Sequence, residues 1–505
     1  MRALDLIDWR FWVACAVLAL PWLNPFAPGP TSAVGPWLTS CCVVAVLLLA
    51  QLFWSVDLRA SVLGWPRVAA SAWLLAGALS SAIGLVQYFG LSAQLTPWVN
   101  ATPLGEAFGN LRQRNQYASL TNIAFAALLW WVVQAKPVVS AAWLRGTQLG
   151  LAVLLAVGNA VSSSRTGMFQ MLVLLALVLL WGGWRWADVR RVAVAHVLAY
   201  VAALMLLPML IGLDPWSSGA WARLQAGDAV CSSRLTLWHN VLTLISLRPW
   251  GGWGWGGLNY AHYITLFDGP RFCDILDNAH NLPLHLAVEL GIPAALIACG
   301  LLLYWVLRSK PWAETDATRQ LAWSVLAVIG LHSLLEYPLW YGPFQIAAGL
   351  GVLLLWRGPS LFERNRALAQ LICALLATAL IAFCSYVAWD YHRISQIYLS
   401  PDDRDPAYRM DTLDKLHASW MFHDQVEFAE LSITPLTLAN APEQYRMALE
   451  MLHFSPEQRV IERVIDTALL LGRDRDAVFH LARYQAAFPE GYAEWMAAHR
   501  APSRP

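Results

Sequence analysis

The stretch LAQLICALLATALIAFCSYVAW, residues 368 to 389, carries no charged side chain along its whole length. A helix needs roughly 20 apolar residues to cross the hydrocarbon core of a bilayer, and this stretch is long enough. Comparable runs recur along the chain. We place about eleven, near residues 9 to 24, 35 to 54, 67 to 89, 116 to 134, 143 to 161, 168 to 184, 192 to 212, 281 to 307, 320 to 338, 342 to 356 and 368 to 389.

The composition agrees with these runs. Of the 505 residues 58% are hydrophobic and 13% are charged, and the mean hydropathy of +0.47 is too high for a water-soluble domain of this length. We therefore expect an all-α polytopic membrane protein, with a transmembrane domain over residues 1 to 389 and a separate polar domain over 390 to 505. The net charge of +1 argues against nucleic acid as a partner.

Orientation follows from the basic loops, because lysine and arginine are retained on the cytoplasmic side. If the N-terminus is cytoplasmic, every even-numbered run leads into a basic loop. The basic residues of these loops are Arg59, Arg67, Lys136, Arg145, Arg185, Arg190, Arg191, Arg308, Lys310, Arg319, Arg357, Arg364 and Arg366. The opposite side, the periplasm of a bacterial inner membrane, then receives the loops 24 to 34, 90 to 115, 162 to 167 and 214 to 280 and the C-terminal domain. The first run lacks a small-residue cleavage site after it, so we expect it to remain as a span.

Two of the eight cysteines, Cys231 and Cys273, lie in the long outside loop 214 to 280. In an oxidising compartment they could close that loop as a disulfide, whereas the alternative is two unrelated free thiols. The other cysteines lie within apolar runs, where a thiol behaves as a small buried hydrophobe.

Polar residues collect in the outside segments, where each needs a partner or a purpose. GNLRQRNQYA begins at Gly109, SSSRTG at Ser162 and CSSRLTLWHN at Cys231. These stretches carry Arg112, Gln113, Arg114, Asn115, Arg165 and Arg234. A single outer arginine can be a headgroup contact, but three clusters at one membrane level favour a diphosphate, because guanidinium forks bind phosphate oxygens bidentately. The glycine-tryptophan run 251 to 257 could bring backbone amides to a phosphate, although a tight turn with interfacial tryptophans is the preferred interpretation.

The stretch LDNAHNLPLHLAVELGIPA, which begins at Leu276, places His280 at the outer mouth of the eighth run. Asn278 or Asn281 can cap the helix that follows. A neutral imidazole there could accept a proton from a hydroxyl nucleophile, and the alternative role is that of a cap. His285 and Glu289 are four residues apart, so we expect a structural pair on one helix face.

A second polar group appears in GLHSLLEYPLWYGPFQ, which begins at Gly330. His332 and Glu336 are again four apart, near Tyr337 and Tyr341. The tyrosines fit an interfacial aromatic belt. Glu336 is more informative, because a carboxylate at that depth usually faces a cavity or an arginine, and it could bind the acceptor or orient an arginine.

These motifs carry a family resemblance. The chain resembles the O-antigen ligase and polymerase superfamily in the order and topology of three motifs: SSSRTG, then SSRLTLWHN with RPWGGWGWGG, then DNAHNLPLHLAVELGIPA. This resemblance implies the GT-C-like transmembrane architecture of the superfamily. Within the superfamily, the chain is similar to the PglL-type protein O-oligosaccharyltransferases, because it has the stretches GNLRQRNQYASL and HSLLEYPLWYGPF and an expected helical C-terminal domain. The resemblance extends from about Gly109 to the C-terminus, and the first three runs carry no motif of the family.

The resemblance implies transfer of a glycan from an undecaprenyl-diphosphate carrier to a serine or threonine hydroxyl of a periplasmic protein, typically a pilin. It implies an inverting reaction without a metal or other cofactor. His280 would activate or orient the acceptor hydroxyl, while Arg165 and Arg234 would neutralise the diphosphate. Arg112 or Arg114 could add to that charge. The second shell and acceptor contacts would come from Gln113, Asn115, Asn281, Glu336 and Tyr341.

The C-terminal stretches PEQYRMALEMLHF, PEQRVIERVIDTALLLG and RDAVFHLARYQAAF have the periodicity of amphipathic helices. FSPEQ at Phe454 is echoed by FPEGY at Phe488, which suggests tetratricopeptide-like packing, with an ordinary helical bundle as the alternative. We expect this domain to dock the acceptor or to support the catalytic loop. PDDRDP, which begins at Pro401, is the one compact acidic group outside the membrane, and we interpret its aspartates as solvated.

Three other functions stay open. Within the superfamily the chain could be an O-antigen ligase with lipid A core as acceptor, or an O-antigen polymerase, which usually has two large outside loops. The C-terminal domain favours a protein acceptor over both. A lipid-linked oligosaccharide flippase could also line a cavity with arginines, but its charges are expected near the bilayer midplane.

Overall fold

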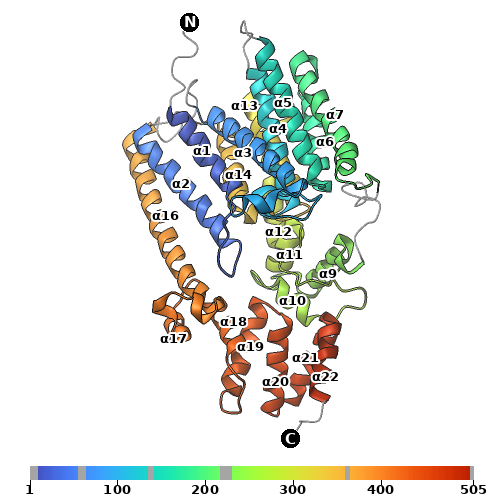
Figure 1. Cartoon of the computed structure of the whole chain (residues 1–505), viewed down its shortest axis with the longest axis vertical. Coiled ribbons are helices and arrows are strands. Elements are labelled where there is room, and N and C mark those ends of the chain that lie inside the picture. Colours follow the sequence, from blue (N-terminus) through green and yellow to red (C-terminus); the bar gives the residue numbers. More distant parts are fainter. Residues whose placement is uncertain (1–8, 55–63, 135–140, 217–229, 359–363, 501–505) are drawn as a thin grey trace. The chain divides into compact units, whose positions relative to one another are not determined.

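The computed structural model describes the chain except residues 1–8, 55–63, 135–140, 217–229, 359–363 and 501–505 (Figure 1). Every regular element in the described ranges is a helix. Arg59 and Lys136 of the predicted basic loops lie outside these ranges, as does the segment 217–229 of the predicted outside loop. The chain divides into two compact units: unit 1 is Met1–Ala226 with Val306–Ser385, and unit 2 is Gly227–Trp305 with Tyr386–Pro505.

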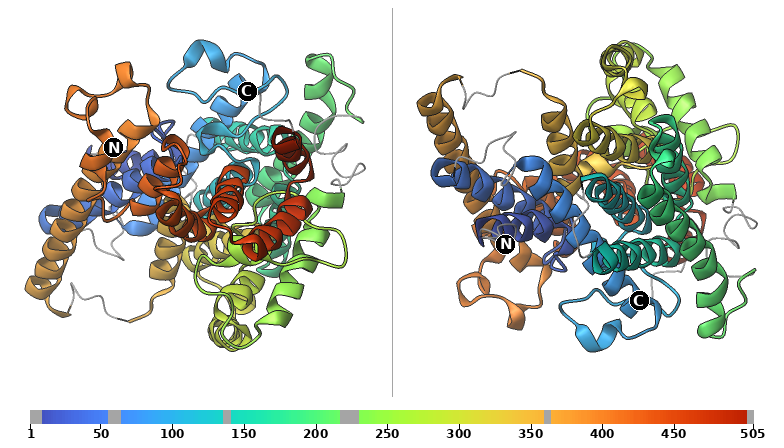
Figure 2. Two further views of the ribbon diagram at one scale, coloured as in Figure 1. Left: turned by 90° about the horizontal axis from the view of Figure 1, so that it is seen from below. Right: turned by 90° about the horizontal axis from the view of Figure 1, so that it is seen from above.

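Unit 1 is a bundle of apolar helices. Its helices are α1 (Trp9–Leu23), α2 (Val34–Trp54), α3 (Trp65–Tyr88), α4 (Arg114–Gln134), α5 (Ala141–Val161), α6 (Arg165–Leu180), α7 (Ala187–Leu210), α13 (Ala317–Ser333), α14 (Gly342–Leu355) and the first two thirds of α16 (Arg366–Ser395), with short 3-10 turns between some of them. Helix α4 is central, because it packs against α3, α5, α6 and α13 and is buried along most of its length (Figure 2). Large side chains such as Trp73 and Phe125 fill the core around it.

The helices confirm a polytopic membrane protein. In the described part of the chain, seven helices are long and apolar enough to cross a membrane: α2, α3, α4, α5, α7, α12 (Ile292–Ser309) and α16 (Arg366–Ser395). Helices α1, α6 and α14 are apolar but shorter. Each of the predicted runs overlaps a helix, while the number of eleven spans stays a prediction.

The prediction of one continuous span over residues 281 to 307 is wrong. The segment forms two helices, α11 (Leu282–Leu290) and α12, which are separated by Gly291 at a φ of 87°. Only glycine fits this position, because a Cβ there would lie 2.2 Å from the carbonyl oxygen of Trp250. The amide of Ile292 also donates to the carbonyl of Pro249 over 2.8 Å. The glycine-tryptophan run therefore packs into the break between the helices.

Unit 2 joins the outside loop to the C-terminal residues. Its first part contains α9 (Arg234–Leu247), α10 (Leu258–Ile264), α11 and the start of α12. The second part contains the end of α16, α17 (Thr412–Leu416), α18 (His423–Ile433), α19 (Ala441–Phe454), α20 (Gln458–Leu470), α21 (Asp474–Ala487) and α22 (Pro489–Arg500). Helices α18 to α22 pack on their sequence neighbours (Figure 1), as expected of either a repeat or a bundle. The tetratricopeptide-like character of this domain stays a prediction.

The two units differ from the predicted domain division at one point. The chain returns to unit 2 at Tyr386, close to the predicted boundary between residues 389 and 390. The loop segment Gly227–Trp305, however, clusters with the C-terminal helices and not with the bundle to which the sequence analysis assigned it. The residues that carry His280 and Arg234 thus fold together with the C-terminal domain.

Candidate active site

The start of α4 carries the first predicted group. The side-chain oxygen of Gln113 accepts a hydrogen bond from the amide of Gln116 over 3.1 Å, so Gln113 caps the helix. The Arg114 guanidinium forms an ion pair with Glu106 at 2.6 Å, and both side chains are partly exposed. Both residues thus fix the loop to the start of α4, and Arg114 already has a carboxylate partner.

Arg112, in the loop before α4, forms a partly buried contact with the main chain of another loop. Its guanidinium donates to the carbonyl of Pro25, and its backbone adopts the left-handed region at a φ of 60°. Burial lowers the pKa of the Arg112 guanidinium. These contacts give Arg112 a structural partner, and its predicted role at the diphosphate stays a prediction.

Asn115 is the centre of a side-chain network. Its amide nitrogen donates to Glu336 over 3.2 Å, and its amide oxygen accepts from the hydroxyl of Ser164 over 2.6 Å. Ser164 in turn accepts from the amide of Gly167 and so caps α6, whose first residue is Arg165. The network therefore brings Asn115, Glu336 and Arg165 to one end of the unit 1 helices, and the roles predicted for these residues stay predictions. Glu336 is buried and Arg165 is half-buried.

A second polar layer lies one turn further along the same helices. Gln170 donates to the hydroxyl oxygen of Ser119 over 2.7 Å, and that oxygen lies 2.9 Å from Nδ1 of His332. The Ser119 hydroxyl therefore joins Gln170 to His332 through two hydrogen bonds. All three side chains are buried. This layer links α4, α6 and α13 beneath the Asn115 network.

Tyr341 lies at the start of α14. Its ring stacks on that of Tyr337 with centroids 6.0 Å apart, and it is half-buried. The tyrosine pair fits the expected interfacial aromatic belt, and the acceptor role of Tyr341 stays a prediction.

His280 belongs to unit 2 and is positioned through the main chain. Its amide donates to the side chain of Asn278 over 2.8 Å, and its φ of 50° lies in the left-handed region. The indole of Trp238 on α9 donates to the carbonyl of Ala279, the preceding residue, over 3.1 Å. A non-glycine residue held at positive φ is uncommon and typical of functional sites. The His280 side chain is half-buried, so it is accessible to a substrate.

Arg234 lies next to this loop on α9. It is the first residue of the helix, and Ser233 caps it by accepting from the amide of Thr236 over 3.1 Å. Trp238 follows four residues later and thus lies on the same helix face as Arg234. Because Trp238 donates to the carbonyl of Ala279, the main chain that carries His280 lies on the side of α9 that also bears Arg234.

The residues around His280 complete this part of the site. Asn281 caps α11 by accepting from the amide of Leu284 over 3.1 Å, as predicted. His285 and Glu289 form the predicted pair, with Nε2 and Oε2 3.5 Å apart in a buried position. Asp277 was not predicted. Although its side chain is exposed, the protein around it desolvates the carboxylate and raises its pKa, and the charge of His280 opposes this shift.

The glycine-tryptophan run caps the end of α11 with two of its amides. The amides of Trp253 and Gly254 donate over 2.9 Å to the carbonyls of Val288 and Glu289. A Cβ on Gly252 would lie 2.3 Å from the carbonyl oxygen of Glu289. The preferred interpretation of a tight turn is confirmed, and the helix beginning near His280 is closed by this turn.

The C-terminal helices support the loop that carries His280. The Tyr263 hydroxyl of α10 lies 2.8 Å from Nδ1 of His480, and Arg483 donates to the carbonyl of Ile264 over 2.7 Å. Asn259 donates to the carbonyl of Phe454 over 2.9 Å. The side chain of Tyr263 belongs to the hydrophobic core of helices α18 to α22. The loop and these helices therefore form one packed body.

Cys231 and Cys273 lie beside each other, and both thiols are free. The amide of Cys273 donates to the carbonyl of Cys231 over 3.0 Å. Desolvation and the adjacent Cys231 thiol raise the pKa of Cys273 to about 11. The proximity is what the disulfide requires, and the disulfide itself stays a prediction.

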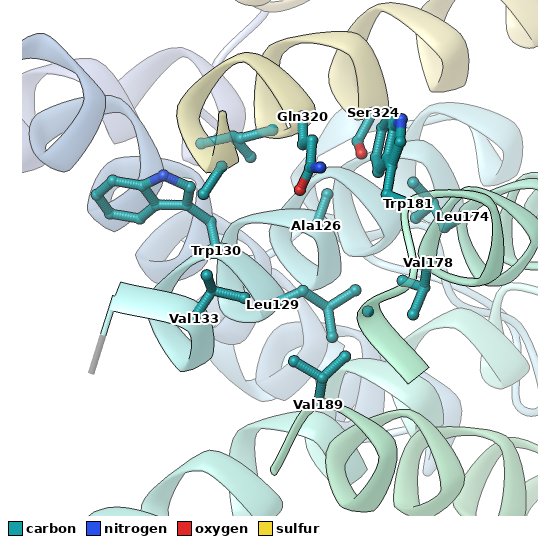
Figure 3. A pocket seen from close by; sticks show the side chains of 13 residues that line it. Ala126, Leu129, Trp130, Val133, Leu174, Val178, Trp181, Val189, Gln320 and Ser324 are labelled. Carbon is teal, nitrogen blue, oxygen red and sulfur yellow. The ribbon is translucent and has the colours of Figure 1, made fainter. Parts of the chain in front are cut away.

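A small pocket at the other end of the unit 1 helices is not a glycan site. It is lined by Ala126 and Trp130 of α4, Val178 of α6, and Gln320 and Ser324 of α13 (Figure 3). Its volume of about 60 Å³ is far below the roughly 300 Å³ at which ligand sites begin. The polar networks of Asn115 and Ser119 lie at the opposite ends of α4, α6 and α13.

The predicted residues thus fall into two groups, each in its own unit. Unit 1 assembles Arg114, Asn115, Arg165 and Glu336, and unit 2 assembles Arg234 and His280. Sequence reasoning did not find Ser119, Gln170, Trp238 and Asp277. Gln170 could have been found, because an amide within an apolar run needs a partner.

Three family profiles match the chain. The profile described as "O-Antigen ligase" matches residues 150–299, which include Arg165, Arg234 and His280. The profile described as "Protein glycosylation ligase" matches residues 107–132, which include Arg114 and Asn115. The profile described as "Virulence factor membrane-bound polymerase, C-terminal" matches residues 320–501.

Two curated proteins of Acinetobacter baylyi are similar to the chain. A ComP-specific O-oligosaccharyltransferase is 26% identical over 247 residues, which are 48% of this chain and 43% of that protein. A general O-oligosaccharyltransferase is 28% identical over 116 residues, which are 23% of this chain and 20% of that protein. The chain thus matches less than half the length of either relative. No solved structure matches it. By these matches the chain is similar to the O-antigen ligase family over residues 150–299 and to the protein glycosylation ligases over residues 107–132.

Proposed function

We propose that this protein transfers a glycan from an undecaprenyl-diphosphate carrier to serine or threonine hydroxyls of periplasmic proteins such as pilins. The enzyme is a glycosyltransferase of the oligosaccharyltransferase class, and its site faces the periplasm from the inner membrane. The predicted runs then act as the spans, with α12 as the eighth. The family matches and the two oligosaccharyltransferase relatives support this assignment.

One repeated observation carries the proposal. Arg165 and Arg234 occur in the same local setting, each as the first residue of a helix that a serine caps. The first turn of a helix carries a partial positive charge and unpaired amides, which favours anions. A guanidinium at that position adds a full charge and a bidentate fork for phosphate oxygens. Each of these helix starts, one in each unit, thus suits an anionic phosphate group.

The chemistry then follows from these groups. The acceptor hydroxyl oxygen attacks C1 of the first sugar, the bond from C1 to the phosphate oxygen breaks, and undecaprenyl diphosphate leaves with the electron pair. His280 accepts the hydroxyl proton. Arg165 and Arg234 stabilise the charge that develops on the leaving phosphate, which is the main electrostatic demand of this step. Attack from the face opposite the leaving group inverts the anomeric centre, and the arginines supply the counter-charge without a metal.

The polar network of unit 1 has a positioning role in this scheme. Asn115 and Ser164 hold the start of α6, and Glu336 fixes Asn115. Arg114 adds positive charge at the start of α4, and its ion pair with Glu106 partly neutralises that charge. Gln113 and Arg112 secure the loop, while Tyr341 and Asn281 remain the proposed acceptor contacts.

A cavity of unit 2 supports a protein acceptor. It has a volume of about 560 Å³ and lies between Trp255 of the glycine-tryptophan run and the helices α18 and α19. Asp424, Glu427 and Glu450 line it. A cavity of this size and polarity can take side chains of a polypeptide, and it borders the run that closes the helix beginning near His280.

Reconstitution tests the function. Purified protein in nanodiscs should move the glycan of an undecaprenyl-diphosphate-linked oligosaccharide to a pilin-like protein, with the modified serine or threonine mapped by mass spectrometry. Lipid A core offered in parallel distinguishes an O-antigen ligase, and growth of the lipid-linked glycan itself distinguishes a polymerase. Movement of intact donor across the bilayer without any transfer would identify a flippase and reject the proposal.

A further inference from the structure

The carbonyl of Gly167, in the first turn of α6, accepts hydrogen bonds from two buried asparagines. The side-chain nitrogen of Asn122 on α4 donates to it over 3.0 Å, and that of Asn159 on α5 donates over 3.4 Å. Asn122 and Asn159 are 0% and 1% exposed. Three helices of unit 1 therefore meet at one carbonyl, two residues after Arg165.

The three helices approach one another closely here because residue 167 is a glycine. A Cβ at this position would lie 2.4 Å from Oδ1 of Asn159 and 2.5 Å from Cβ of Ala118. Both distances are well inside van der Waals contact, and the interior of a helix bundle leaves no room to relieve them. A larger side chain would therefore separate α6 from α4 and α5 and lengthen the bonds to the Gly167 carbonyl.

The first turn of α6 is also attached at its beginning. The hydroxyl oxygen of Ser164 accepts from the backbone amide of Gly167 over 3.0 Å, and the same hydroxyl donates to Asn115 over 2.6 Å. Arg165 lies between Ser164 and Gly167. Side chains of neighbouring helices thus hold both ends of the short segment that carries Arg165.

The two asparagines are unfavourable for the stability of the bundle. Their Oδ1 atoms are buried and have no hydrogen-bond partner among the described residues. A buried amide oxygen without a partner destabilises a protein, and the Gly167 carbonyl, inside a helix, also has the backbone amide four residues later as its partner. Polar residues within membrane-spanning helices usually serve a function. These observations favour a role in placing the first turn of α6 over a role in stability.

We propose that Asn122 and Asn159 are positioning residues for Arg165. They fix the Gly167 carbonyl and thereby the direction in which the Arg165 side chain leaves the first turn of α6. A guanidinium on a fixed backbone meets the charge of the leaving phosphate without a prior rearrangement, which is what electrostatic stabilisation of a transition state requires. The inference rests on the proposed function, because that function gives Arg165 its role at the phosphate.

Asn122→Leu tests the proposal in the full-length protein in nanodiscs, with an undecaprenyl-diphosphate-linked oligosaccharide and a pilin-like acceptor. Leucine keeps the approximate shape of asparagine but cannot donate to Gly167. We expect kcat to fall about tenfold through misplacement of Arg165, with an unchanged KM for the acceptor. Thr121→Val is the matched control, because the buried Thr121 hydroxyl donates over 2.7 Å to the carbonyl of Ala118 on its own helix, a carbonyl that Asn122 also contacts. This control should keep the kcat of the unchanged protein.

A combination with Arg165→Ala separates positioning from stability. If Asn122 acts through Arg165, Asn122→Leu should slow the Arg165→Ala enzyme no further. Two losses that multiply would overturn the proposal, because Asn122 would then act independently of Arg165. An unchanged kcat in Asn122→Leu, or full activity of Arg165→Ala, would overturn it as well.

Hydrogen–deuterium exchange of residues 162–168 gives a second readout that needs no substrate. Exchange should be faster in Asn122→Leu than in the unchanged protein and in Thr121→Val, and equal exchange in all three would overturn the proposal. Asn159→Leu removes the longer bond and should show a smaller change in the same direction, which guards against a local disturbance at Asn122. Failure of the proposed function would look different: the unchanged protein would transfer no glycan, while the difference in exchange would persist.

Discussion

The two arginines that we assign to the diphosphate have the same helical setting but different surroundings. Around Arg165, most of the bonds join side chains: Asn115 bridges Ser164 and Glu336, and Gln170 donates to Ser119 and to the carbonyl of Val328 in α13. Around Arg234 and His280, the main chain makes the hydrogen bonds: the carbonyl of Ala279 accepts from Trp238, and the amide of His280 donates to Asn278. The first group is a rigid helix end, and the second is a loop whose shape depends on its backbone. Substitutions should therefore act through lost polar contacts in unit 1 and through loop geometry in unit 2.

The largest effect in this comparison is expected at the arginines themselves. Arg165→Ala should lower the transfer rate by about 10²- to 10³-fold, as removal of one oxyanion-stabilising group does in other enzymes. Arg165→Lys should recover part of the rate, because lysine keeps the charge but lacks the bidentate fork. Arg234→Ala and Arg234→Lys should show the same order. Initial rates with saturating donor measure this, and unchanged rates in both alanine variants would remove the arginines from the mechanism.

The Asn115 network gives the next largest effect. Asn115→Asp replaces the donor to Glu336 with a carboxylate, and we expect about a tenfold loss of rate, or roughly 1.4 kcal/mol, near the value of one hydrogen bond to a charged group. The double variant Asn115→Asp with Glu336→Gln reverses the polarity of the same bond and should restore most of the activity. If the double variant is as slow as the single one, the bond from Asn115 to Glu336 has no positioning role.

Sequence reasoning found the helical runs because apolar periodicity and length are local properties. It proposed Arg165 and His280 because each stands at a polar boundary of such a run, and Arg234 because of its motif in the outside loop; these roles stay predictions. It missed the break at Gly291, because that break depends on the approach of Trp250, which lies forty-one residues earlier in the chain. It also missed Ser119 and Trp238, whose roles come from tertiary contacts that no spacing reveals. The side-chain network of unit 1 and the backbone contacts of unit 2 thus required the structure.

A smaller effect is expected where the main chain carries the geometry. Trp238→Phe keeps the ring but removes the donor to the carbonyl of Ala279, and the rate should fall by about threefold to tenfold, the value of one neutral hydrogen bond. Trp253→Phe is the matched control, because it removes an indole bond to the carbonyl of Leu244 in the same loop core. The kcat values of the two variants show whether the Trp238 bond positions His280 or only stabilises the loop. Equal losses would mean that Trp238 contributes only to stability.

The smallest expected effect is a pH dependence of the stability of unit 2, whose C-terminal helices pack against the loop that carries His280. Burial, together with the charge of Arg483, lowers the pKa of His480 to about 4, while Asp476 opposes the shift. The unfolded chain therefore binds more protons than the folded one between about pH 6.5 and pH 4, so stability is full above this window and falls as the pH drops through it. Thermal unfolding of unit 2, followed by proteolysis near neutral pH and at about pH 5, should show a shift of a few degrees.

His480→Asn removes the titrating ring but keeps a hydrogen-bonding side chain beside Tyr263. This variant should lose most of the pH dependence while its unfolding temperature near neutral pH changes little. A dependence that persists in the variant would assign the proton uptake to another group.

The central claim is that the protein transfers a glycan to a hydroxyl with His280 as the proton acceptor. The most direct test is the yield of glycosylated pilin-like acceptor from His280→Ala and from the unchanged protein, each in nanodiscs with a radiolabelled undecaprenyl-diphosphate-linked donor. Membrane insertion and elution as a folded species are checked for both proteins first. We predict glycosylated acceptor from the unchanged protein and none above background from the variant. Product at the level of the unchanged protein from His280→Ala would contradict the account.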